Sequence, residues 1–218
     1  EYSRDIEPMK GGHTGNYYYQ MIDGIRRFKG VRPPEKSSGP KTILIDGRFD
    51  DWKRVRPEFR DWVGDTEHRD SQGWGDAGRY VNKTGRNDFV RLKVAYDAKN
   101  VYFYAETRDA ITSAKDPNWM LLFISTGASK GWNGYDFLAG KAIGSWPGLT
   151  HLTHMSHAIS GNKMELAIPR SDLGLSGKPV KLDFHWADNI QRPDIIEFSV
   201  SGDSAPDRRF NYHFEEKT

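Results

Sequence analysis

The pattern of hydrophobic and polar positions changes its period near residue 43. Before that point, the apolar residues of segment 16–29 recur at intervals of three and four, which predicts an amphipathic helix. These residues are Tyr18, Met21, Ile22, Ile25 and Phe28. Thr14 or Asn16 can cap the start of the helix, and Gly30 ends it. The sequence therefore predicts one helix near the N-terminus.

A segment rich in proline and serine follows the predicted helix, with the sequence VRPPEKSSGPK. Residues of these types do not form a regular element at this density, so residues 31–41 are expected to be a linker or a strap across a surface. A domain boundary is placed here. It separates residues 1–30 from a second region, residues 42–218.

In the second region the period becomes two, which is typical of half-buried strands. A hairpin is predicted where Val90, Leu92 and Val94 alternate with polar residues and an Asp-Ala-Lys-Asn turn follows. A second hairpin is predicted around Gly161-Asn162. The segment WMLLFIS is apolar on both faces, as in a central strand covered on two sides. Further short strands are predicted in ILIDG, VKLDFHWA, IIEFSV and FNYHF.

These patterns give about eight to ten short strands separated by turn signals, with little helix after Phe28. The predicted fold is mainly β: an antiparallel two-sheet sandwich, similar to a jelly roll, with one N-terminal helix.

The composition narrows the classes of function. Charged residues make up 28% of the chain, but the formal net charge is only +2, so no single-sign field exists to collect nucleic acid or an anionic membrane surface. No apolar run approaches the length of a membrane span. The chain has no cysteine, which excludes disulfides and thiolate metal sites. Aromatic residues reach 13%, and we expect most of these rings in the core and some at the surface.

Four motifs in the β-patterned region carry a family resemblance through their order and spacing. They are ILIDGRFDDW, VAYDAKNVYFYAETRD, WMLLFIS and GNKMELAIPRSDLGL. Together they resemble the carbohydrate-binding modules of family 9 and the wider group of DOMON-like sandwiches, over roughly residues 42–215. The resemblance implies a module of the kind commonly appended to secreted bacterial glycoside hydrolases.

The N-terminal stretch carries a second resemblance. EYSRDIEP followed by GNYYYQMIDGIRRF is similar to the last loop and last helix of a (β/α)8 barrel of glycoside hydrolase families 71 and 99. Glu1-Tyr2 and Ile6-Glu7-Pro8 match that pattern. The resemblance implies that residues 1–30 are the C-terminal remnant of a catalytic barrel. A barrel active site is assembled from the ends of several strands, so this chain by itself is expected to be non-catalytic, with the catalytic residues upstream.

Two functions remain open. The first is a glycan-binding module that holds polysaccharide or oligosaccharide near the enzyme and raises its effective concentration. The second is a structural accessory domain that packs on the catalytic barrel without binding sugar. Both imply an extracytoplasmic protein that is secreted, periplasmic or at the cell surface. The expected partners are a glycan and the upstream barrel of the same polypeptide, with no nucleic acid and no membrane span.

The candidate sugar-binding residues come from two segments. Segment 61–88 is long and has no clear periodicity, and loops of that kind are usually functional or disordered. It offers flat rings, including Trp62, and planar polar groups, which sugar recognition needs; the alternative is that its rings anchor the loop on the sandwich. The Gly-rich segment 129–146 offers further rings, and its glycine-rich surroundings favour their exposure. The predicted carbohydrate-binding residues are Trp74, Tyr80, Arg86, Asn87, Asp88, Trp132, Tyr135 and Trp146.

Histidines and methionines give no metal or haem prediction. His151, His154 and His157 are three residues apart, but in a strand His154 faces away from the other two. We interpret them as surface histidines. Met120, Met155 and His154 have no spacing that supports haem.

Calcium is the single cofactor for which the sequence offers ligands. Asp46, Asp50 and Asp51 lie in a turn, and oxygen-rich turns can hold this ion. The commoner role of such residues is an Asx turn. No metal ligand is assigned.

Overall fold

The computed structural model describes residues 21–22, 24–25, 27–28, 35–66, 69–73, 75–127 and 131–216. The chain divides into two compact units, residues 1–35 and residues 36–218. The described residues of the first unit between 21 and 28 are helical, in agreement with the helix predicted over residues 16–29. The remainder of that segment, and Glu1 to Pro8, lie outside the described residues.

The second half of the predicted linker belongs to the second unit. The backbone N–H of Ser38 donates to Arg56 O at 3.2 Å, and that of Lys41 donates to Tyr96 O at 2.6 Å. Ser37 is buried. Residues 36–41 are therefore a strap on the sandwich rather than a free linker.

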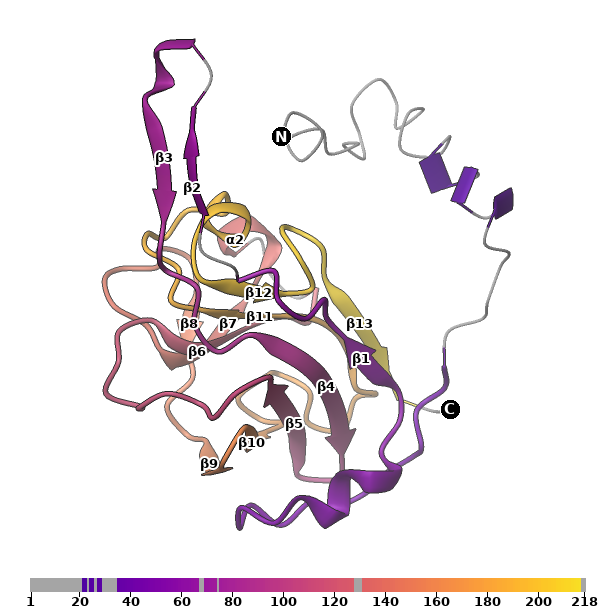
Figure 1. Cartoon of the computed structure of the whole chain (residues 1–218). Coiled ribbons are helices and arrows are strands. Elements are labelled where there is room, and N and C mark those ends of the chain that lie inside the picture. The colour runs from indigo at the N-terminus through magenta and orange to yellow at the C-terminus, as the bar shows by residue number, and fades with distance from the viewer. Residues whose placement is uncertain are drawn as a thin grey trace. The chain divides into compact units, whose positions relative to one another are not determined.

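The second unit is mainly β and is built around two larger sheets (Figure 1). The first sheet has five antiparallel strands in the order β1-β4-β5-β10-β9. Their bounds are β1 Glu58–Arg60, β4 Phe89–Tyr96, β5 Asn100–Thr107, β9 Ser156–Ser160 and β10 Lys163–Pro169. Both predicted hairpins lie in this sheet: Tyr96 pairs with Val101, and Ser160 pairs with Lys163.

The second sheet has six strands in the order β12-β11-β6-β7-β8, and β13 also pairs with β11. Their bounds are β6 Trp119–Ser125, β7 Phe137–Lys141, β8 Thr150–His151, β11 Lys181–Asp188, β12 Asp203–Ala205 and β13 Tyr212–Glu215. All these pairs are antiparallel except β7 with β8.

A small two-stranded sheet lies inside segment 61–88, where the sequence shows no periodicity. It consists of β2 (Arg69–Gln72) and β3 (Arg79–Asn82), joined across the 3₁₀ helix η4 (Gly75–Ala77). In Figure 1 this hairpin extends away from the two larger sheets. Most of its described side chains are exposed, which explains the lack of an apolar pattern.

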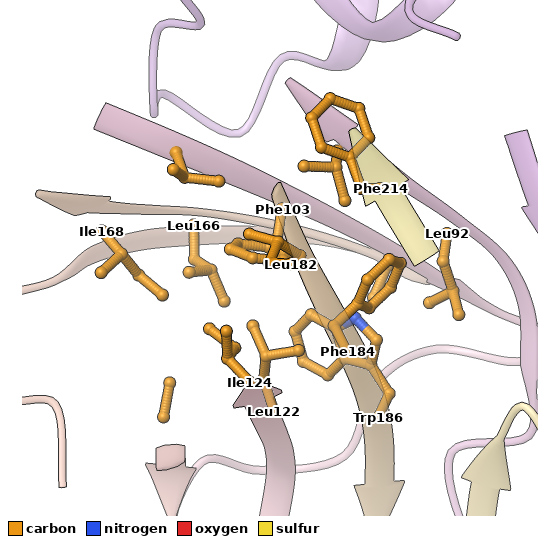
Figure 2. Close-up of a cluster of buried hydrophobic side chains, with 14 of the residues drawn as sticks. Leu92, Phe103, Leu122, Ile124, Leu166, Ile168, Leu182, Phe184, Trp186 and Phe214 are labelled. Carbon is orange, nitrogen blue, oxygen red and sulfur yellow. The ribbon is translucent and has the colours of Figure 1, made fainter. Parts of the chain in front are cut away.

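One hydrophobic core joins the two larger sheets. Phe103 on β5 and Phe184 on β11 meet with ring centroids 5.8 Å apart. Figure 2 shows Leu122, Ile124 and Leu166 in the same cluster. Face-to-face packing of this kind makes the unit a sandwich, as the alternating patterns predict.

Each sheet also buries its outer face. On β6, Leu122 and Ile124 face the shared core, whereas Leu121 and Phe123 belong to a second cluster. A third cluster covers the outer face of the first sheet and contains Trp52, from the 3₁₀ helix η3 (Phe49–Arg54). Because β6 is covered by one cluster on each face, its segment WMLLFIS is apolar on both faces.

Two predicted strands are wrong. The segment IIEFSV contains the short helix α2 (Glu197–Val200), not a strand. Phe198 on α2 turns into the second cluster, and Glu197 receives a hydrogen bond of 2.8 Å from Arg192 Nε, so tertiary contacts decide its conformation. Residues 43–45 form no strand and join no sheet. No helix among the described residues is long and apolar enough to cross a membrane.

Candidate functional site

The loop after β1 places a tryptophan at the surface and carboxylates in the interior. Asp61 follows the last residue of β1, and residues 63–66 form a turn. The side chain of Trp62 is 74% exposed, and that of Val63 is 48% exposed. Asp61 and Asp65, on either side of this pair, are partly buried. The loop thus separates an apolar surface from an acidic interior.

Carboxylates from distant parts of the chain meet beneath this loop. One oxygen each from Asp61, Asp65 and Asp203 lies within 4.8 Å of the others. Asp203 is on β12 and is 4% exposed. Asp88 lies near enough to act electrostatically on all three, and Asp207 acts on Asp61 and Asp65. We call Asp61, Asp65 and Asp203 the carboxylate cluster.

Backbone donors satisfy only part of this acidic region. The N–H of Phe89 donates to Asp203 Oδ2 at 2.7 Å, and that of Gly64 donates to Asp88 Oδ2 at 2.9 Å. Two further oxygens, Asp61 Oδ2 and Asp65 Oδ1, are buried and have no hydrogen-bond partner among the described residues. Buried polar atoms without a partner are rare in folded proteins and call for a proton, a water or an ion.

The environment favours the protonated carboxyls. Burial raises the pKa of Asp61 to about 8, and the charge of Asp65 adds to this effect. Burial, together with a hydrogen bond to Asp207, raises the pKa of Asp65 to about 8. Burial is also the first cause that raises the pKa of Asp203 and of Asp88. Ionising all of these carboxyls would bring like charges together in a desolvated site, which is unfavourable.

The carboxylate cluster fits a hard divalent cation. Its donors are all oxygens, which suit calcium, and two ligands each about 2.4 Å from one ion lie at most about 4.8 Å apart. Asp61, Asp65 and Asp203 would hold the ion, and the two unpartnered oxygens would gain a ligand. A bound cation would supply the positive charge that the site lacks.

The aspartates that the sequence offered for calcium do not gather into such a group. Asp46 Oδ1 accepts the N–H of Arg48 at 2.8 Å, which is an Asx turn. Asp50 Oδ1 lies 2.6 Å from Lys53 Nζ, and Asp51 Oδ2 accepts a backbone N–H. Their carboxylates are occupied by local partners.

The three histidines also remain apart. His151 is on β8, His154 Nδ1 lies 3.2 Å from Asp172 Oδ2, and the ring of His157 lies 6.2 Å from that of Trp119. The carboxylate cluster is the one group of three potential ligands among the described residues.

Arg86 and Asn87, which the sequence assigned to sugar recognition, have partners within the fold. Arg86 Nε donates to Asp188 Oδ2 at 2.6 Å, and this carboxylate is fully buried. Asn87 adopts φ 53° and accepts the N–H of Thr112 at 2.9 Å. These planar groups join segments of the sandwich, and their hydrogen-bonding capacity is used there.

The other predicted residues of segment 61–88 differ in their surroundings. Tyr80 on β3 is 37% exposed, and its hydroxyl donates to Val200 O at 3.3 Å. Asp88 is buried beside the carboxylate cluster. Trp74 lies outside the described residues. The sequence did not single out Asp61, Asp65 or Asp203.

The Gly-rich segment places its rings in the second hydrophobic cluster. Tyr135 is 2% exposed and Trp146 is 4% exposed. Trp132 is partly buried against both, with its ring 5.1 Å from that of Trp146. Phe123 on β6 contacts all three rings. The faces of Tyr135 and Trp146 are therefore covered by the protein, contrary to the exposed rings expected in this segment.

Neither a family model, nor a curated protein, nor a solved structure matches the chain. The function must therefore be argued from the site itself.

Proposed function

We propose that the sandwich is a non-catalytic module that binds polysaccharide or oligosaccharide through Trp62. The observation that carries this proposal is the 74% exposure of that side chain. The two roles considered for the rings of segment 61–88 were anchoring the loop and binding sugar. A ring that is three-quarters exposed anchors very little, so the second role is favoured.

The chemistry around Trp62 supports a sugar ligand. The flat face of an indole packs against the C–H groups of a sugar ring, and its N–H can donate to a hydroxyl. Tyr80, on β3 of the same segment 61–88, is also exposed.

The wider context of the proposal rests on the resemblance to family 9 modules. In that context the chain is the C-terminal part of a bacterial extracytoplasmic glycoside hydrolase, and the catalytic residues belong to an upstream barrel. Retaining the substrate would raise its effective concentration at that barrel.

The alternative function uses the same exposed pair. Trp62 and Val63 together form an apolar surface, and such surfaces also mark contacts between protein domains. In this case the sandwich would be a structural accessory domain, and Trp62 would dock on the catalytic barrel without binding sugar.

Native gel electrophoresis with soluble polysaccharides in the gel separates the two functions. A panel of β-glucans, xylans, mannans and α-glucans should contain at least one that retards the parent chain. Trp62→Ala should abolish the retardation. The matched control is Leu44→Ala, because Leu44 is a comparably exposed apolar residue, at 64%, away from the loop.

If a glycan retards Trp62→Ala as strongly as it retards Leu44→Ala and the parent chain, Trp62 is not part of the binding site. If no polysaccharide in the panel retards the parent chain, the proposal fails and the accessory-domain function takes its place.

A further inference from the structure

A second feature, separate from Trp62, is a pocket of about 270 Å³ on the outer face of the five-stranded sheet. The 3₁₀ helix η3 forms one wall with Phe49, Trp52 and Lys53. The outward-facing residues of β4, β5 and β10 form the floor. The complete lining is Phe49, Asp50, Trp52, Lys53, Arg91, Lys93, Tyr104 and Lys163.

The lining is cationic. It contains four cationic side chains, Lys53, Arg91, Lys93 and Lys163, and one carboxylate, Asp50. Asp50 is already engaged, because its Oδ1 lies 2.6 Å from Lys53 Nζ. Three cations therefore remain without a counter-charge from within the lining.

The carboxylates behind the pocket do not balance this charge. Glu58 contacts four cationic groups, with oxygens 2.8–3.8 Å from Arg56, Arg60, Arg91 and Lys93. Glu106 lies 3.4 Å from Arg91 and accepts the Tyr104 hydroxyl at 2.9 Å.

Glu165, on the same outer face, is fully buried. It accepts the backbone N–H groups of Asp46 and Gly47 and the indole N–H of Trp52. These three donors already satisfy it. The four cationic side chains of the lining, together with Arg56 and Arg60, thus share four carboxylates. These are Asp50, Glu58, Glu106 and Glu165, and Glu165 is already used by neutral donors.

One cation in the pocket, Lys163, has an unused side chain. Its ammonium has neither an ion pair nor a hydrogen bond among the described residues. The Nε of Arg91 is buried and lacks a hydrogen-bond partner, although Glu58 Oε1 lies 3.3 Å away. Lys93, 5% exposed, donates to Trp52 O at 2.9 Å. Burial and the charges of Arg56 and Arg91 lower its pKa.

We infer that this pocket binds an oxyanion, a carboxylate, sulfate or phosphate group, between Lys163, Arg91 and Lys93. An oxyanion offers the acceptor oxygens that the unpaired ammonium of Lys163 lacks, and such charge-assisted hydrogen bonds are strong. It also relieves the like-charge contact between neighbouring cations. The inference does not depend on the role of Trp62.

Isothermal titration calorimetry at fixed ionic strength tests the inference. The probes are sodium sulfate, sodium phosphate and sodium glucuronate, with chloride as the reference anion. At least one probe should bind saturably with one site per chain. Lys163→Ala should weaken that binding about tenfold, and Lys163→Glu should abolish it.

The control is Lys99→Ala, which removes an exposed lysine in the β4–β5 turn and should leave the affinity unchanged. Tighter binding of glucuronate than of both inorganic ions would identify an acidic sugar as the source of the oxyanion, and the reverse order would identify a free anion. Absence of saturable binding, or equal affinities for the parent and Lys163→Glu, would overturn the inference. Binding here that survives Trp62→Ala would show that the two sites are independent.

Discussion

The guanidinium of Arg86 lies 2.6 Å, measured from Nε, from Oδ2 of Asp188, a carboxylate whose side chain has no exposed surface. Asp188 Oδ1 also accepts the N–H of Met120 at 2.8 Å. The pair joins the end of segment 61–88 to the end of β11. Arg86, which the sequence assigned to sugar recognition, therefore has a structural role.

Arg86→Ala should therefore destabilise the protein by about 3–5 kcal/mol, because it leaves a buried carboxylate without its counter-charge. Urea unfolding followed by circular dichroism measures the loss. Arg79→Ala is the control: Arg79 pairs with Asp70 at 2.5 Å on the exposed hairpin, and such pairs contribute about 1 kcal/mol or less. Equal effects of the two changes would contradict a structural role for Arg86.

The carboxylate cluster predicts an unusual pH dependence. Asp61 and Asp65 have folded-state pKa values of about 8, against about 3.9 in the unfolded chain. The folded state binds more protons between these limits, so this contribution is complete below about pH 4 and is lost as the pH rises to about 8. Buried His185, with its pKa lowered to about 4 by burial, has the opposite effect below about pH 6.5.

Between pH 6.5 and 8 the opposing effect of His185 is absent, and the free energy of unfolding should fall as the pH rises. Asp61→Asn should flatten this slope and raise the free energy of unfolding at pH 8 by about 1 kcal/mol or more. Asp76→Asn, on the exposed 3₁₀ helix η4, should change neither. A slope that is flat in the parent chain would show that the cluster is not protonated at neutral pH.

Calcium should counteract the loss of stability that accompanies the rise in pH. If Asp61, Asp65 and Asp203 hold the ion, millimolar calcium should raise the thermal midpoint at pH 8, by an amount equivalent to about 2.7 kcal/mol at a hundredfold excess over Kd. Chelation should reverse the shift. Asp203→Asn should abolish it, whereas Asp50→Asn should not. An identical midpoint with calcium and with chelator would leave the cluster as a protonated structural group.

The tryptophans should separate into two kinds. Trp146 is buried in the second hydrophobic cluster, so Trp146→Ala should cost about 3–5 kcal/mol of stability through the cavity it leaves. Trp62→Ala should change stability by about 0.5 kcal/mol or less, because the ring is exposed. Denaturant unfolding of both variants checks this contrast, and a large loss in Trp62→Ala would mean that the ring packs more tightly than its exposure indicates.

Local patterns predicted both hairpins of the first sheet. The alternation around Tyr96 and Val101, and around Ser160 and Lys163, fixes two hairpins because the turn and both strands are adjacent in sequence. The segment IIEFSV failed for the opposite reason, since buried Phe198 and the Arg192–Glu197 contact lie outside any strand pattern.

The candidate site was less accessible to sequence reasoning. Segment 61–88 contains Asp61 and Asp65, but the carboxylate cluster also needs Asp203, which is more than a hundred residues away along the chain. Likewise, nothing near Arg86 indicates that Asp188 will neutralise it. For Trp146, glycine-rich surroundings suggested exposure, whereas the ring packs on Phe123 of β6. Long-range pairing decides these roles.

The most direct test of the central claim is the affinity of Trp62 variants for the glycan that retards the parent chain in the gel, measured by isothermal titration calorimetry. Trp62→Phe keeps an aromatic face and should weaken binding modestly, whereas Trp62→Ala should weaken it by about tenfold or more, as expected for an aromatic anchor at the centre of a contact. Equal dissociation constants for the parent, Trp62→Phe and Trp62→Ala would contradict glycan binding through Trp62.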